Sequence, residues 1–108
     1  MAAARDWAEK SQLLALPGFA DRLEGRAALA VGDAERGFDR LRRARATFAR
    51  LEAAWDRART ELVLADALLE AGRRDEVTEV AGAALATLSS LDAPMELDRA
   101  KALVSRAG

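Results

Sequence analysis

Two stretches of this chain echo each other at an offset of 40 residues, and this echo constrains the fold more than any other feature. Gly32 aligns with Gly72, and each follows an alanine- and leucine-rich stretch. Four apolar positions after the glycines also coincide: Leu41 with Ala81, Ala44 with Ala84, Phe48 with Leu88, and Leu51 with Leu91. An internal period of roughly 20–50 residues is typical of stacked supersecondary units. The echo therefore predicts a repeated helical hairpin.

The composition favours helices and leaves little material for strands. Alanine, leucine and arginine dominate, whereas aromatic residues make up only 5% of the chain and tyrosine is absent. These are helix-forming residues, and strand-favouring residues are scarce. The 108 residues suit one domain. We therefore predict a single all-α domain over residues 1–108.

Helical periodicity and its breakers predict six helices, joined by short turns so that neighbouring helices run antiparallel. Leu16-Pro17-Gly18 indicates a break after the first helix, and Gly32-Asp33 indicates a helix-ending glycine followed by an N-cap. Asp75 is the expected cap after Gly72. The predicted helices span residues 2–15, 17–31, 34–53, 55–71, 76–91 and 95–106. They pair as hairpins over 2–31, 33–71 and 75–107, with repeat copies over 18–53 and 55–91.

The second copy resembles a tetratricopeptide repeat, with leucine and a small residue before a helix-ending glycine and small or apolar residues after it. These positions are Leu64, Ala65, Leu68, Gly72, Val77, Ala81 and Ala84, with the turn AGRRDE at 71–76. The first copy keeps small residues such as Gly25 and Ala44 but departs from the motif at Glu24. The resemblance implies a short solenoid of stacked hairpins. In such a solenoid, small residues let helices approach closely.

The long period resembles the helical C-terminal regions of bacterial signalling regulators, including LuxR-type ATPase transcription factors and cyclase-linked ATPases. Residues 48–77 carry this likeness, which implies a regulatory protein-interaction module that binds a protein or peptide. The family's groove positions imply a peptide-contact set of Phe19, Arg22, Arg26, Leu29, Ala30, Arg59, Leu62, Asp66, Leu69 and Glu70. The competing interpretation is self-packing of a short array, with Leu62 and Leu69 in the core.

The residue types argue against catalysis and against a bound cofactor or metal. Histidine and cysteine are absent, so His-dependent triads and the common transition-metal sites are not expected. No phosphate-binding glycine motif occurs. Carboxylates cluster at Asp75-Glu76 and Glu96-Asp98, where predicted helices begin and the helix dipole favours acidic residues. We therefore expect a binding protein and no enzyme.

Arginines crowd the predicted helix over 34–53. Arg36, Arg43 and Arg50 recur every seven residues, away from the apolar stripe. They are either an anion-binding patch, with nucleic-acid contact as one version, or a solvated face paired with nearby carboxylates. The solvated face is the favoured interpretation, because no aromatic residues are interleaved for base stacking. Arg45 falls at the edge of the apolar stripe instead, where a structural salt bridge is expected.

Charge and hydropathy indicate a cytoplasmic chain that contacts no membrane. They also argue against a protein whose overall charge attracts nucleic acid. The formal net charge is −1. No apolar stretch approaches the roughly 20 residues of a membrane span, and the first residues lack a signal-peptide pattern. Apolar residues near the start, Trp7, Leu13 and Leu14, are unlike the polar outer cap of a terminal repeat, which indicates either a piece of a longer array or contact with a second copy through an end face. Homo-oligomerisation, or a structural bundle with no separate ligand, is therefore the alternative to a peptide-binding role.

Overall fold

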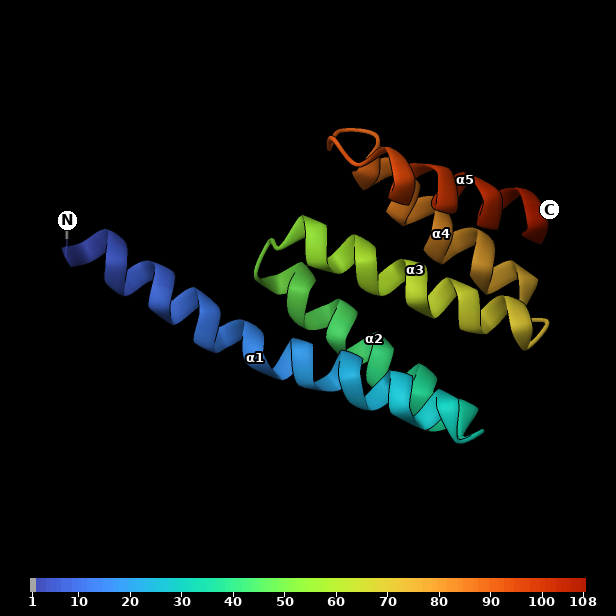
Figure 1. Cartoon of the computed structure of the whole chain (residues 1–108), viewed down its shortest axis with the longest axis horizontal. Helices are drawn as coiled ribbons and strands as arrows, with labels where there is room; N and C mark the ends of the chain where they lie inside the picture. The colour runs from blue at the N-terminus through green and yellow to red at the C-terminus, as the bar shows by residue number, and fades with distance from the viewer. Residues whose placement is uncertain (1) are drawn as a thin grey trace.

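The computed structural model describes residues 2–108, with the side chains of residue 10 and residues 12–108. Within this range the chain forms helices and no strand, which confirms the all-α prediction. The five helices are α1 (Ala2–Ala30), α2 (Ala34–Arg50), α3 (Ala54–Glu70), α4 (Arg74–Leu88) and α5 (Pro94–Ala107). Each runs antiparallel to the one before it (Figure 1). Among these helices, none is both long and apolar enough to cross a bilayer. The side chain of Trp7 lies outside the described residues.

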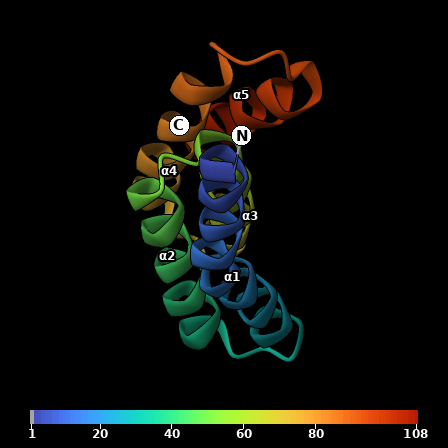
Figure 2. The ribbon, with the colours of Figure 1, turned by 90° about the vertical axis from the view of Figure 1, so that its left-hand side faces the viewer.

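The helices lie in two layers. Figure 2 shows α1, α3 and α5 in one layer and α2 and α4 in the other. Each helix packs against its neighbour in sequence, and α3 also contacts both α1 and α5. The molecule is therefore elongated and flat, with extents of 49 × 31 × 19 Å, and α3 lies at its centre.

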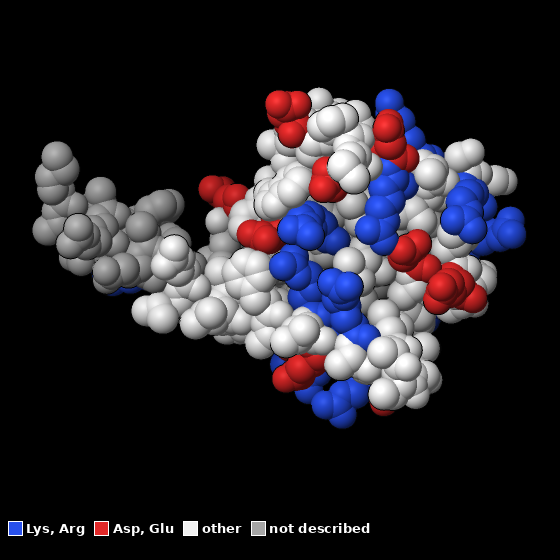
Figure 3. Space-filling model, viewed as in Figure 1, with Lys and Arg blue, Asp and Glu red and all other residues white. Residues whose placement is uncertain are grey.

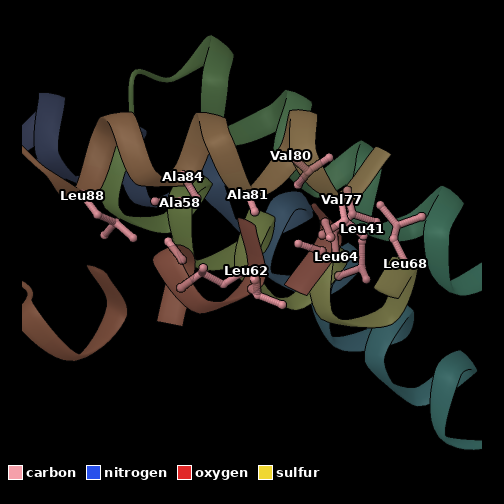
Figure 4. Close-up of a cluster of buried hydrophobic side chains, with 14 of the residues drawn as sticks. Leu41, Ala58, Leu62, Leu64, Leu68, Val77, Val80, Ala81, Ala84 and Leu88 are labelled. Carbon is pink, nitrogen blue, oxygen red and sulfur yellow. The ribbon is translucent and has the colours of Figure 1, made fainter. Parts of the chain in front are cut away.

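Most of the echoed apolar positions are core positions. Leu41, Ala44 and Phe48 are fully buried, as are their counterparts 40 residues later. The last pair differs, because Leu51 is half-buried and Leu91 is exposed at the end of its turn. The main core forms where α3 and α4 meet, with Leu41 of α2 reaching in (Figure 4).

The predicted break at Leu16-Pro17-Gly18 is wrong, because α1 runs through Pro17 without interruption. The predicted helices 2–15 and 17–31 are thus one helix, and residues 2–31 form no hairpin. An internal proline loses a backbone hydrogen bond and destabilises a helix by about 3 kcal/mol. The packing of the residues just after Pro17 against Phe48 of α2 offsets this penalty. Gly18 packs so closely on Phe48 that a Cβ there would lie 2.9 Å from Phe48 Cζ, and the Phe19 ring meets the Phe48 ring edge-on at 5.0 Å.

Two helix-ending glycines behave as the sequence predicts. Gly32 and Gly72 have φ values of 85° and 76°, a left-handed conformation in which glycine has no Cβ to clash. Asp33 then caps α2, since its carboxylate accepts a hydrogen bond from the Arg36 backbone N–H at 3.4 Å. Asp75 is not the cap of α4, however. The N-cap is Arg73, and Asp75 lies inside the first turn, where its charge favours the helix dipole.

The turn between α2 and α3 uses the same backbone geometry without a glycine. Helix α2 ends at Arg50, three residues before the predicted end, and Glu52 has a φ of 56°. The Ala53 backbone N–H donates to the Phe48 carbonyl at 2.9 Å, as Asp33 does to Ala28 at 2.9 Å. Helix α4 likewise ends early, at Leu88, after which residues 89–93 form an irregular turn.

Replacing Glu52 by glycine should stabilise the fold. A non-glycine residue in the left-handed region is strained by about 1–2 kcal/mol, and glycine removes this strain. Glycine also raises the conformational entropy of the unfolded chain, which cancels part of the stabilisation. We expect the free energy of unfolding to rise by about 0.5–1 kcal/mol and Tm by a few degrees. Urea and thermal unfolding followed by circular dichroism measure both. Glu96→Gly, in the first turn of α5, is the matched control and should be destabilising. Destabilisation by both variants would contradict the strain at Glu52.

Candidate binding surfaces

A groove runs between α1 and α3 on the layer that carries the predicted contact set. It has a volume of about 200 Å³. Its lining residues are Arg26 and Leu29 from α1, and Val63, Asp66, Ala67 and Glu70 from α3. Four of the predicted residues, Arg26, Leu29, Asp66 and Glu70, thus come together in what we call the α1–α3 groove. Arg26 and Asp66 are themselves equivalent positions at the 40-residue offset.

Both signs of charge border the α1–α3 groove. Asp66 pairs with Arg99 of α5, and both of these side chains are half exposed. Arg26 and Glu70 are exposed, and neither forms an ion pair with the described side chains. On the face viewed in Figure 3, basic side chains gather across the middle of the face, and acidic side chains lie around them. The groove therefore offers an apolar floor with a cation and an anion at its edges.

The other predicted contact residues serve the fold or lie outside the groove. The Arg22 guanidinium lies over the rings of Phe19 and Phe48, at 5.1 and 5.6 Å from their centroids. Burial lowers the pKa of Arg22, although Asp56, 3.8 Å away, opposes this shift. Leu62 is only 3% exposed and belongs to the core. The remaining three are Leu69, packed against the core, Arg59, over the Trp55 ring, and Ala30, exposed near the end of α1.

A larger groove lies between α2 and α4, with α3 as its floor, and sequence reasoning did not anticipate it. Its volume is about 700 Å³. The lining residues are Arg42, Arg45, Ala46 and Ala49 from α2, Arg57 and Glu61 from α3, and Ala83, Ala86 and Thr87 from α4. Alanines form the walls of this α2–α4 groove, and charged side chains form its base and rim.

The base of the α2–α4 groove is a buried carboxylate. Glu61 is 1% exposed, and its Oε2 accepts a hydrogen bond from Arg45 Nε at 2.7 Å. Arg57 Nε lies 3.8 Å from the other oxygen, Oε1, and neither of these two atoms has a hydrogen-bond partner. Arg45 also pairs with Glu79 of α4 at 3.3 Å. The salt bridge predicted for Arg45 is therefore confirmed, with Glu61 as its buried partner.

Burial shifts the pKa values of the two partners of this ion pair in opposite directions. Burial raises the pKa of Glu61, and the favourable charges of Arg45 and Arg57 offset this effect only in part. Burial also opposes the charge of Arg45, but hydrogen bonds and charges from Glu61 and Glu79 outweigh it and raise the pKa of Arg45. Desolvation thus prevails at the carboxylate, whereas the attraction of the neighbouring carboxylates prevails at the guanidinium.

Helical phase contains the signal that marks Glu61. It lies three residues after Ala58 and four before Ala65, both of them fully buried. Glu61 therefore lies on the buried side of α3, and Arg45 lies at the core edge of α2. When the two helices pack together, these opposite charges meet as an ion pair. Arg45 was recognised from its phase, whereas Glu61 was not.

The arginines of α2 divide into two groups. Three pair across to other helices: Arg40 with Asp21 and Glu24, Arg42 with Glu76, and Arg45 with Glu61 and Glu79. The predicted patch, Arg36, Arg43 and Arg50, lies exposed on the outer side of α2. Within it Arg43 lies 4.0 Å from Asp39, and Arg50 donates to the Thr47 hydroxyl at 3.5 Å. This arrangement matches the solvated, partly paired face that the sequence favours.

Among the described residues, no group of three or more acidic side chains is arranged to hold a metal ion. Comparisons with protein-family models, with curated proteins and with solved structures found no match for this chain.

Proposed function

We propose that this chain is a tetratricopeptide-like protein-interaction module that binds a peptide segment in the α1–α3 groove. The proposal includes the role that the long-repeat resemblance implies, as a regulatory or scaffolding part of a bacterial signalling or transcriptional regulator. One observation carries it: four residues assigned to peptide contact from the sequence line one groove, although α1 and α3 are separated by a whole helix.

The chemistry of the groove suits a peptide with mixed character. Leu29, Val63 and Ala67 supply apolar contact, and Arg26 and Glu70 have no ion-pair partner among the described side chains. Extended or helical peptides use such a combination, with apolar anchors for affinity and flanking charges for register. We therefore favour a ligand that places an apolar side chain between one acidic and one basic residue.

The larger α2–α4 groove is the weaker peptide site despite its volume. Its rim charges already neutralise one another, through Arg42 with Glu76 and Arg45 with Glu79. A ligand there would have to displace these ion pairs and would gain little from alanine walls. The smaller groove has unpaired charges and larger apolar side chains, so it is the better match for a partner.

Plugging each groove separately tests this proposal. Ala67→Trp fills the α1–α3 groove, and Ala83→Trp is the matched control in the α2–α4 groove, since both alanines are half-buried lining residues. The probe is a phage-displayed 12-residue peptide library selected on the wild-type chain. We expect selected peptides to lose about tenfold or more in affinity for Ala67→Trp, measured by fluorescence polarisation. Their affinity for Ala83→Trp should be unchanged.

The reverse pattern would move the site to the α2–α4 groove and overturn the proposal. Failure of the library to enrich any peptide would also count against it. Charge reversal gives a second check on the same peptides. Arg26→Glu should weaken those with an acidic flank while sparing those without one.

A further inference from the structure

An apolar stripe runs along the outer side of α1, and no other part of the described chain covers it. Its residues are Leu13, Leu16, Ala20, Leu23, Ala27 and Ala30, and all six are exposed. The exposed fractions of the leucines, 65%, 57% and 72%, are high for residues on a bundle helix. The opposite side of α1 holds Gly18, Gly25 and Ala28, which are all buried, and the two glycines lie against α2. The stripe therefore faces directly away from the bundle.

The spacing of this outer stripe is that of a helix–helix seam. Its residues are separated by steps of three and four in strict alternation, the a and d positions of a heptad pattern. The flanking positions are uncharged along the first half of the stripe, at Gln12, Pro17 and Phe19, and charged along the second half, at Glu24 and Arg26. None of the six stripe residues is charged, and the exposed charged residues of this segment, Glu24 and Arg26, lie beside the stripe.

We propose that the outer stripe pairs with the same stripe of a second copy of this chain, with the two α1 helices antiparallel. Reversing the stripe on itself matches Leu13 with Ala30, Leu16 with Ala27 and Leu23 with Ala20. Every layer then contains one large and one small side chain, as close helix packing requires. A parallel pair in register would set leucine against leucine in three layers and alanine against alanine in the other three, so that some layers are crowded and others are empty.

The shape of the chain leaves room for this antiparallel pair. The first half of α1 projects beyond α2 and the rest of the bundle (Figure 1). In the register above, residues 13–21 of each α1 lie along residues 22–30 of the partner's α1, and the projecting start of each helix extends past the end of the partner's α1. An isologous two-fold contact of this kind closes on itself and forms a dimer, not a filament.

The area buried between the two α1 helices sets the expected affinity of the dimer. Eighteen residues give a seam about 26 Å long and about 10 Å wide. Two such surfaces cover roughly 500 Å² in total, within the range of weak, transient interfaces, which lies below about 1,200 Å². The dimer is therefore reversible, with a Kd on the order of 10–100 µM.

Sedimentation velocity over a range of about 5 to 500 µM tests the self-association. We expect the wild-type chain to move from monomer to dimer across this range. Leu23→Glu should raise the Kd at least about tenfold, because it places two charges in the seam. Met95→Glu is the matched control: Met95 is 81% exposed but lies on α5, and its substitution should change nothing. Circular dichroism confirms that both variants remain helical.

Cross-linking determines the orientation, since the chain has no native cysteine. Leu16→Cys and Ala27→Cys are prepared as separate proteins, and a short bismaleimide is added to each and to their mixture. Antiparallel pairing predicts a covalent dimer in the mixture and little in either protein alone.

Three results would overturn the proposal. A wild-type chain that is monomeric at the highest concentration leaves the stripe to a different partner. Equal effects of Leu23→Glu and Met95→Glu place the contact elsewhere. Cross-linking of Leu16→Cys alone indicates parallel helices. Ala67→Trp should leave the Kd of self-association unchanged, so this test is independent of peptide binding in the α1–α3 groove.

Discussion

Replacing Arg45 by alanine should lower the free energy of unfolding by about 3 kcal/mol, at the lower end for breaking a buried ion pair. The substitution removes the only hydrogen bond to the Glu61 carboxylate among the described residues. Arg57 remains 3.8 Å from Glu61 Oε1, which keeps the loss from being larger. Urea unfolding of the two chains, followed by circular dichroism, measures the difference.

The matched background for this prediction is Glu61→Gln, which keeps the shape of the side chain and removes its charge. In that background the loss caused by Arg45→Ala should fall to about 1 kcal/mol, because no buried charge is left unpaired. An equal loss in both backgrounds would show that Arg45 stabilises the fold through the packing of its stem alone.

The pH dependence gives an independent signature of Glu61. Its pKa is raised in the folded chain, so the folded state holds this proton more tightly than the unfolded state does. The resulting stabilisation is complete below the ordinary glutamate pKa of about 4.3 and is lost as pH rises through the higher folded value. Glu61→Gln should therefore gain stability relative to the wild-type chain as pH increases through this window. A difference that is flat with pH would contradict the raised pKa.

The sequence predicts those elements whose signals are local. Gly32-Asp33 marks both the end of α1 and the start of α2, because a left-handed glycine and a capping carboxylate act within a few residues. The predicted end of α2 is wrong because Glu52 adopts the same left-handed backbone conformation in a place where no glycine signals it. Local chemistry cannot reveal such a residue, since the packing of the flanking helices holds it there.

The binding surfaces depend more strongly on tertiary contacts. Groove residues on α1 and α3 were identified because the repeat assigns them equivalent positions, as it does Arg26 and Asp66. The α2–α4 groove was missed, because its walls are alanines that look like ordinary helix formers until α2 and α4 are set apart across α3. Likewise, the outer stripe is visible only once α1 is known to be one continuous helix.

Phe48→Ala should have the largest effect of any substitution considered, about 4 kcal/mol, because it leaves a large cavity in the core. For a domain of this size that is a major part of the total stability. Phe48 is fully buried, and the packing of Gly18, Phe19 and Arg22 against its ring holds the segment of α1 that follows Pro17. We therefore also expect local opening of α1 around Pro17.

Phe38→Ala separates these two effects, because Phe38 is an equally buried phenylalanine on the same helix. Its ring meets Arg42 and Arg73, far along α2 from the Pro17 segment. Both variants should lose several kcal/mol of global stability in urea. Only Phe48→Ala should accelerate amide hydrogen exchange over residues 15–22 beyond the change in global stability. Similar exchange in the two variants would mean that α1 passes Pro17 through its own helical preference, and that the contact with Phe48 is a consequence of the continuous helix instead of its cause.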